Sequence, residues 1–277
     1  MTLFPRIAVV LAAAVALPCR AATPLDADPN AVARAMDGKR IVVLGEVHDN
    51  AAQHALRLAA LRILVEGGAR PALAFEQFDH EWQADIDHAR RERPRDAGHV
   101  IAAGKGAPSW RWELYRPFVQ LALDYDLPIV AANLSRRGAM DVATQPRTGA
   151  APSVPVAVQR AHEDAIAKGH CNLLPPEALP GMANAQIARD RTLAESLRPH
   201  SAQGVVLLTG NGHARTDIGV PFWLTPDERR ASVSIGILER DDDADAGEPA
   251  GRFDAFVLTA RAERPDPCEE LRKRYRK

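Results

Sequence analysis

Six short apolar runs without polar alternation restrict the fold of this chain more than any other feature. They read IVVLG, ALAFE, PIVAAN, VVLLTG, SVSIGIL and DAFVLT, and they start at Ile41, Ala72, Pro128, Val205, Ser232 and Asp254. Strands that are covered on both faces have this composition. Helical patterns separate the first four runs, and the clearest extends from a cap at Asn50 to Glu66. This alternation predicts an α/β fold with a mainly parallel central sheet flanked by helices.

Two stretches interrupt the alternation of strands and helices. Residues 81–105 are charged and helical in pattern, and residues 139–180 are rich in Pro and Gly around one short helix. We expect both to be helical insertions that form a cap over the carboxyl edge of the sheet. The last two apolar runs follow each other closely, which favours an antiparallel pair at one edge. Since no linker divides the chain, residues 22–277 are predicted to form a single domain.

The N-terminus has the pattern of an export signal. A short cationic start precedes an unbroken apolar run at residues 7–17, which is too short to span a membrane. We therefore predict a signal peptide over residues 1–21, cleaved after Ala21, and a periplasmic or outer-membrane-associated protein. Lipidation of Cys19 is the alternative, although Pro18 makes that motif a poor one. The formal net charge of -1 gives no support to nucleic-acid binding.

Export also determines how the cysteines are interpreted. Without Cys19, the chain retains Cys171 and Cys268, an even pair in an oxidising compartment. We predict a disulfide bond between them that ties the C-terminal segment to the middle of the chain. Two unpaired thiols are the alternative.

Polar residues follow four of the predicted strands. Glu46 and His48 come after the first strand, Glu76 ends the second, Arg136 lies just beyond the third and His213 follows the fourth. In an open parallel sheet, the carboxyl ends of the strands form the ligand crevice. Residues two apart in extended backbone project in the same direction. The sequence therefore predicts one polar site that gathers these side chains.

The chemistry of this set fits two kinds of site. Glu46, His48 and His213 are residue types that bind a divalent cation. With Glu76 they would activate water, as in a metal-dependent hydrolase of esterase or peptidase type. Alternatively, the set would orient an anionic ligand, with Arg136 engaging a carboxylate through two hydrogen bonds.

Each of these residues also has a purely structural interpretation. Glu46 would stabilise the N-terminus of the following helix, where carboxylates are favoured. His48 and His213 would be hydrogen-bonded structural histidines. Glu76 would form an ion pair with Arg136.

Five motifs together resemble a known family. They are GEVHDNAAQH, AFEQF, WRWELYRPFVQLA, AANLSRR and GNGHAR, in this order. They are similar to ChaN-like haem-binding uptake proteins of the Tiki/TraB/erythromycin-esterase-like superfamily, over residues 39–224. The resemblance implies an α/β core with a helical cap, an envelope location and haem binding linked to iron acquisition. For more distant relatives it implies metal-dependent hydrolysis. The chain departs from the expected pattern at Leu134 and Ser135, where a small residue and a proline are usual.

Haem binding requires an apolar slot, an axial ligand and basic groups for the propionates. Tyr115 is the preferred axial ligand, because Trp110 and several arginines surround it in the sequence; its alternative role is to line the core. His170, beside Cys171, is the second candidate, and Arg136 is a candidate partner of a propionate. The leading hypothesis is an exported haem-binding protein that supports iron uptake. Its expected partners are haem and an envelope receptor or transporter, and a homodimer that shares haem is compatible with the sequence.

The predicted disulfide is open to a direct measurement. Thiol alkylation followed by mass analysis of the oxidised protein should leave Cys171 and Cys268 unmodified, because a disulfide has no thiol to alkylate. Alkylation of both cysteines without prior reduction would contradict the bridge.

Overall fold

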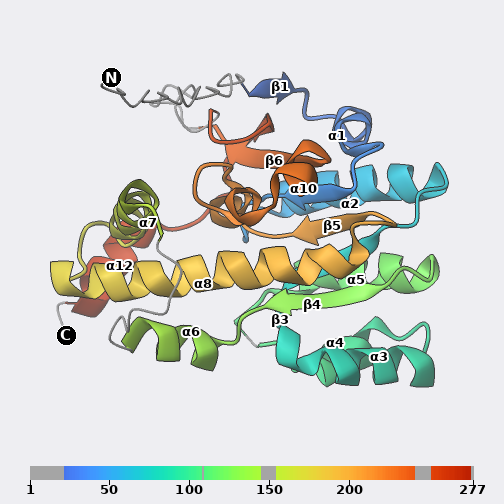
Figure 1. Ribbon diagram of the computed structural model, residues 1–277, viewed down its shortest axis with the longest axis horizontal. Helices are drawn as coiled ribbons and strands as arrows, with labels where there is room; N and C mark the ends of the chain where they lie inside the picture. The colour runs from blue at the N-terminus through green and yellow to red at the C-terminus, as the bar shows by residue number, and fades with distance from the viewer. Residues whose placement is uncertain (1–21, 108, 145–153, 241–250, 276–277) are drawn as a thin grey trace, which may run out of the picture.

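A seven-stranded sheet, parallel throughout, forms the centre of the molecule (Figure 1). The computed structural model describes residues 22–107, 109–144, 154–240 and 251–275. The predicted signal peptide and Cys19 lie outside this range. The strand order is β1-β7-β6-β2-β5-β3-β4. Their bounds are β1 (Thr23–Leu25), β2 (Ile41–Leu44), β3 (Ala72–Asp79), β4 (Ile129–Asn133), β5 (Val205–Leu208), β6 (Ser232–Glu239) and β7 (Ala255–Thr259).

The six apolar runs are all strands, as predicted, but two details of the sheet differ. β1 was not predicted, because three residues are too few to show a pattern. The predicted antiparallel pairing of the last two runs was wrong, since β6 and β7 are parallel. In the sequence, 15 residues (240–254) separate the two strands, enough for the crossover that a parallel connection requires.

Alternate residues of the strands enter two separate cores. Val42 and Leu44 of β2 belong to one core, with α1 (Pro29–Met36), α2 (Ala51–Glu66) and α5 (Trp112–Asp124). Ile41 and Val43 belong to the other core, which α8 (Leu179–Leu197) covers together with α9 (Asn211–Ala214) and a 3₁₀ turn (Val220–Trp223). The short helix α10 (Pro226–Arg230) precedes β6 and buries none of its residues. In Figure 1, α8 crosses in front of the sheet. Burial on both faces explains why the runs lack polar alternation.

The two predicted insertions occupy different places. In the first, a 3₁₀ turn (His80–Trp82), α3 (Gln83–Glu92) and α4 (Ala97–Ala103) lie beside the edge strand β4 (Figure 1). The 3₁₀ turn lies at the carboxyl ends of β3 and β4, where Nδ1 of His80 contacts the carbonyl of Asn133 at 2.9 Å, whereas α3 and α4 lie beside the edge strand. The second insertion contains α7 (Val156–Gly169) and a 3₁₀ turn (Pro176–Ala178), and α7 lies beyond those ends, next to α8. The helix α6 (Arg136–Thr144) leads into it.

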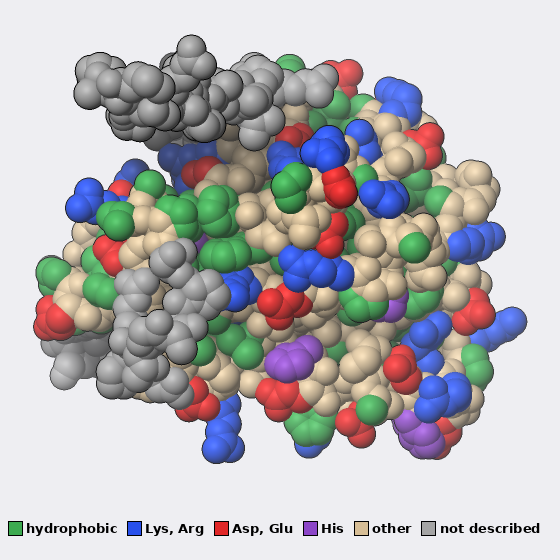
Figure 2. Space-filling view, in the orientation of Figure 1, with side chains coloured by type: hydrophobic (Ala, Val, Ile, Leu, Met, Phe, Trp, Pro, Cys, Tyr) green, Lys and Arg blue, Asp and Glu red, His purple; other side chains and the backbone are tan. Residues whose placement is uncertain are grey.

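A disulfide bond joins Cys171 to Cys268, with 5.6 Å between their Cα atoms, which confirms the predicted pairing. It connects the turn after α7 to the C-terminal helix α12 (Pro267–Tyr275). Across the face shown in Figure 2, acidic and basic side chains are interspersed, which agrees with the net charge near zero. None of the helices in the described ranges combines the length and the apolar character needed to cross a bilayer.

Gln83 protects one edge of the sheet. Its amide group donates to the carbonyl of Ile129 at 2.9 Å and accepts from the N–H of Ala131 at 2.7 Å, so it satisfies two groups of β4 that have no strand partner. Replacing Gln83 with Leu should lower the free energy of unfolding by about 1–3 kcal/mol for each group left unsatisfied. Urea denaturation measures this loss. Asp85→Asn, an exposed change on the same helix, is the control; equal stability of the two variants would contradict the role of Gln83.

Candidate functional site

The register of three adjacent strands brings the predicted site residues together. Leu44 of β2 and Phe75 of β3 both lie opposite Leu208 of β5. The residues that follow, Glu46, Glu76 and Gly210, therefore share one edge of the sheet. The N–H of Asn211 donates to the carbonyl of Glu46 at 2.9 Å, which fixes the two loops against each other.

Glu46 is almost completely buried and its carboxylate has four partners. One oxygen forms an ion pair with Arg57 and lies 3.0 Å from Nε2 of His54. The other oxygen accepts from the hydroxyl of Tyr115 at 2.5 Å and from Nδ1 of His48 at 2.9 Å. These partners come from α2, α5 and the loop after β2. Glu46 thus joins three segments of the chain through a single charged group.

Protonation states follow from the burial of this cluster. Burial lowers the pKa of Arg57 to about 10, so the guanidinium stays charged at neutral pH. Burial lowers the pKa of His54 to about 4, so that imidazole is neutral. Burial raises the pKa of Tyr115, which keeps its hydroxyl protonated as a donor. The cluster therefore contains the ion pair of Glu46 with Arg57, and His54 and Tyr115 join it as neutral hydrogen-bonding groups.

His48 is the member of this cluster that meets solvent, with 47% of its side chain exposed. Because a carboxylate only accepts, the contact with Glu46 places the ring proton on Nδ1 and leaves the lone pair on Nε2. The ring packs against Gly210, where an added Cβ would lie 2.7 Å from Cε1 of His48. On its other side, the ring meets Trp110 edge-on with 5.0 Å between centroids. The orientation of His48 is therefore well defined.

A second buried cluster surrounds His213. Its Nδ1 donates to Asp190 at 2.7 Å, and its Nε2 lies 3.6 Å from Glu76. Burial alone would lower the pKa of His213, but the two carboxylates outweigh it and raise this pKa to about 9. Burial alone would raise the pKa of Glu76. This pKa nevertheless falls to about 2, because the positive charge of His213 and the hydrogen bonds from Thr209 and Gly210 favour the carboxylate. Thus His213 is an imidazolium between two acidic groups.

Asp190, the other acidic partner of His213, has a raised pKa, unlike Glu76. Burial raises the pKa of Asp190 to about 6, despite the attraction of His213. Its second oxygen lies 3.8 Å from Nε2 of His162, whose own pKa burial lowers to about 4. His162 is therefore neutral, and it hydrogen-bonds to the carbonyl of Ile218 at 3.2 Å.

A pocket of about 450 Å³ opens between the two clusters and α7. One wall comes from Glu46 and His48, another from the loop at Gly210, and the opposite wall from α7 and α8. Residues of α7, the turn after it and α8 that line the pocket include His162, Ala165, Ile166, His170, Gln186 and Asp190. Its volume lies in the range of small-molecule binding sites, roughly 300–1,000 Å³.

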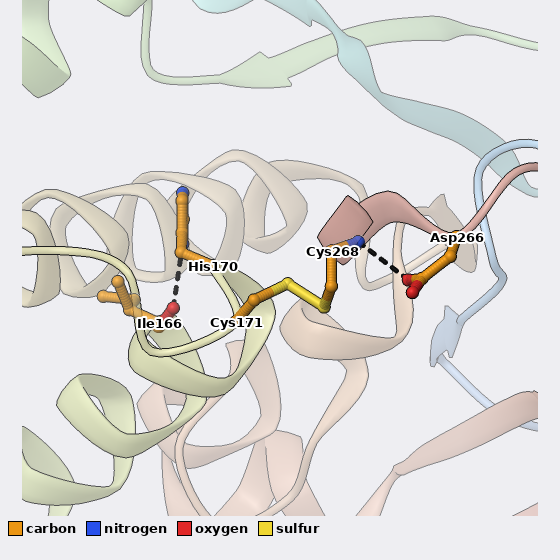
Figure 3. The surroundings of a disulfide bond; sticks show 5 residues. All are labelled: Ile166, His170, Cys171, Asp266 and Cys268. Carbon is orange, nitrogen blue, oxygen red and sulfur yellow. Dashed lines mark hydrogen bonds between the residues drawn. A yellow bond between two sulfur atoms is a disulfide. The ribbon is translucent and has the colours of Figure 1, made fainter. Parts of the chain in front are cut away.

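His170 ends α7 at the rim of this pocket. Its Nδ1 lies 2.8 Å from the carbonyl of Ile166 (Figure 3). A carbonyl only accepts, so the proton is on Nδ1 and Nε2 keeps its lone pair. Imidazoles that ligate metal ions are usually oriented in this way, with the other nitrogen donating to a carbonyl or carboxylate.

The structure separates the predicted site residues into two groups. Glu46, His48, Glu76 and His213 come together at the sheet edge, as the strand ends indicated. Arg136 does not join them: it is exposed at the start of α6, and Glu76 contacts His213 instead.

The two aromatic candidates also differ in position. Tyr115 is fully buried with its hydroxyl on Glu46, so it does not face the pocket. Trp110 is half-buried against His48.

Within the predicted metal set, protein groups engage the carboxylate of Glu46 and one nitrogen of His213. Glu46 is paired with Arg57 and hydrogen-bonded to Tyr115, and Nδ1 of His213 is held by Asp190. In the described part of the chain, no group of three or more His, Cys, Asp and Glu side chains is arranged to hold a metal ion. The set Glu46, His48 and His213 thus differs from the metal site that its residue types suggested.

Sequence analysis missed Arg57 and Asp190, although the sequence contains a signal for each. Asp190 interrupts an apolar stripe of α8, between Ile187 and Ala194 at helical spacing. Arg57 follows Leu56 on the buried side of α2. A charged residue in an apolar helical stripe is almost never buried unless it is paired, so each one indicates a buried partner.

Residues 32–224 match the family of ChaN haem-binding uptake proteins in the Tiki superfamily, and the chain belongs to this family. The match spans the sheet edge, both clusters and α7. No curated protein matches the chain significantly.

The chain is similar to several solved structures. ChaN of Campylobacter jejuni, described with cofacial haem binding, is 22% identical with a TM-score of 0.66, over 80% of this chain and 88% of that one. The type III effector HopBA1 is 14% identical with a TM-score of 0.46, over 84% and 94%. A mutant of the erythromycin esterase EreC is 12% identical with a TM-score of 0.47, over 79% and 76%.

The raised pKa of His213 predicts a pH dependence of stability. Because the pKa in the folded state, about 9, exceeds the ordinary value of 6.5, the ion pair of His213 with Glu76 contributes fully below pH 6.5, and the ion pairs of His213 are lost as the pH rises through 9. The difference in free energy of unfolding between the wild type and His213→Gln should shrink over this window. Urea denaturation across the window measures it, with the exposed His88→Gln as control. A difference independent of pH would refute the imidazolium.

Proposed function

We propose that this chain is an exported haem-binding protein that serves haem or iron uptake, and that haem enters the pocket beside His170. Membership of the ChaN family supports haem as the ligand. The observation that carries the site is the free Nε2 of His170 at the rim of the pocket, with Nδ1 held by the Ile166 carbonyl. Histidine with an oriented ring is a common axial ligand of haem iron.

The remaining lining of the pocket also suits haem. Ala165, Ile166 and Ile218 give apolar surface for a porphyrin edge. Arg215, whose guanidinium forms an ion pair with Asp217, would add positive charge near a propionate. When bound, haem would supply an iron with an open coordination position. The role of the protein would be to hold His170 at that position and to exclude competing ligands.

Export is supported by an independent feature. Disulfide bonds persist in oxidising compartments and are rare in the cytosol. The bond between Cys171 and Cys268 therefore agrees with a location outside the cytoplasm, as the N-terminal sequence predicts. A receptor or transporter in the envelope and a homodimer that shares haem stay predictions.

The alternative, a metal-dependent hydrolase, is not favoured. It needs a site with at least three protein ligands to the metal, whereas the acidic groups and imidazoles in the described ranges do not form one.

Haem titration tests the proposal. The wild-type protein should give a saturable shift of the Soret band. His170→Ala should weaken binding by about 10- to 100-fold, because it removes the axial nitrogen, whereas the exposed His88→Ala should bind like the wild type. Tyr115→Phe removes only a buried hydroxyl and should lower stability without abolishing the shift.

Two outcomes would contradict this assignment. The absence of a saturable shift in the wild type would remove haem as the ligand. Loss of the shift in Tyr115→Phe, with His170→Ala unaffected, would instead identify Tyr115 as the axial ligand, and the pocket would be the wrong site.

A further inference from the structure

The C-terminal helix α12 has little that holds it to the rest of the molecule except its disulfide. None of its side chains that the structure describes is buried. Lys273 pairs with Glu269 within the helix itself. A helix that is polar all round gains no packing energy of its own. The bond from Cys268 to Cys171 is therefore its main attachment to the body.

The segment before α12 is attached firmly to the loop that carries His48. Arg264 forms ion pairs with Asp49, at 2.6 Å, and with Glu239. Nδ2 of Asn50 donates to the carbonyl of Ala260 at 3.0 Å and to Glu239 at 2.7 Å. Asp49 and Asn50 directly follow His48. One end of this segment is thus fixed to the wall of the pocket that His48 forms.

The other end is fixed to the opposite wall. Cys171 directly follows His170, and Figure 3 shows the disulfide leaving the turn that ends α7. Cys171 and Asn172 have φ angles of 57° and 55°, in the left-handed region that residues other than glycine rarely adopt. Backbone hydrogen bonds from Cys171 to the carbonyl of Lys168, at 2.9 Å, and from Asn172 to the carbonyl of Ala167, at 2.7 Å, form this turn. The disulfide adds a covalent link that ties the turn to the segment before α12.

We propose that residues 260–268 form a reducible strap that links the two walls of the pocket. The strap joins the His48 loop, through Arg264, to the His170 turn, through Cys268, and sets the spacing between the two imidazoles. This inference rests on the proposed function, because its purpose is to position a haem ligand. Arg264, Cys171 and Cys268 are positioning residues that do not touch the ligand.

Release of the strap needs only a dithiol reductant. One thiolate of the dithiol attacks a sulfur of the Cys171–Cys268 bond, and the second thiol resolves the mixed disulfide. The protein gains two electrons and two protons as two thiols, and the dithiol becomes a disulfide. Both cysteines are partly exposed, so a reductant can reach them. The turn then relaxes, His170 moves and the pocket loosens its ligand.

Three variants, each compared with the parent protein, test the strap without any haem. In a Cys19→Ser background, Cys171→Ser with Cys268→Ser removes the bond and leaves no thiol in the chain. Arg264→Gln breaks the other attachment, and the exposed Arg261→Gln on the same segment is its control. Hydrogen exchange should increase at residues 166–172 in the double serine variant and at residues 46–50 in Arg264→Gln. Arg261→Gln should match the parent protein.

Haem titration then measures the effect on the pocket. Binding should weaken by about 10-fold in the double serine variant, as is typical when the support of a metal ligand is removed. Reduction of the parent protein with dithiothreitol should also weaken haem binding. The serine variant is the decisive comparison, since free thiols of the reduced protein would themselves bind haem iron.

The outcomes separate this inference from the proposed function. Equal haem affinity of the parent protein and the double serine variant would overturn the strap while haem binding stands. If the oxidised parent protein binds no haem, the proposed function fails. In that case the strap is judged from hydrogen exchange in the double serine variant. Unchanged rates at residues 166–172 would overturn the strap, and increased rates would support it as a structural support of the pocket.

Discussion

The ion pair between Glu46 and Arg57 is completely removed from water, and the arrangement of the site depends on it. Loss of one partner of such a pair typically costs about 3–5 kcal/mol, because the other charge is left buried and unpaired. This cost fixes α2 against the end of β2. The same carboxylate then fixes Tyr115 of α5 and His48, so one charged group determines the positions of three segments. The site is consequently formed before any ligand arrives.

The histidines on the two sides of the pocket are oriented by the same device. His48 donates its Nδ1 proton to Glu46, and His170 donates its Nδ1 proton to a carbonyl of its own helix. Each ring therefore has its lone pair on Nε2. The difference lies in their supports: His48 rests on the buried cluster, whereas His170 ends a helix that a disulfide holds. The two walls of the pocket are thus supported by different kinds of interaction.

The fold and part of the site could be predicted because strong local signals produce them. Apolar runs without alternation gave six strands, and Asn50 caps α2 as expected, its side chain accepting from Gln53 at 3.2 Å. Glu46, Glu76 and His213 meet because parallel strands end at one edge, a consequence of topology alone. The predictions that were wrong concern the directions in which side chains point and strands run in the tertiary structure. Nothing in the sequence shows that Tyr115 points inward to Glu46, that Arg136 turns to solvent or that β7 runs parallel to β6.

The edge strand β1 has a consequence for how the molecule assembles. Its only partner within the described sheet is β7, the last strand of the chain, with Thr23 opposite Ala255. A chain that emerges from its N-terminus exposes the first strand long before its neighbour exists, and closing so long a loop is slow. Completion of the sheet therefore waits for the final residues, so a chain truncated before β7 leaves both β1 and the outer side of β6 open to intermolecular pairing.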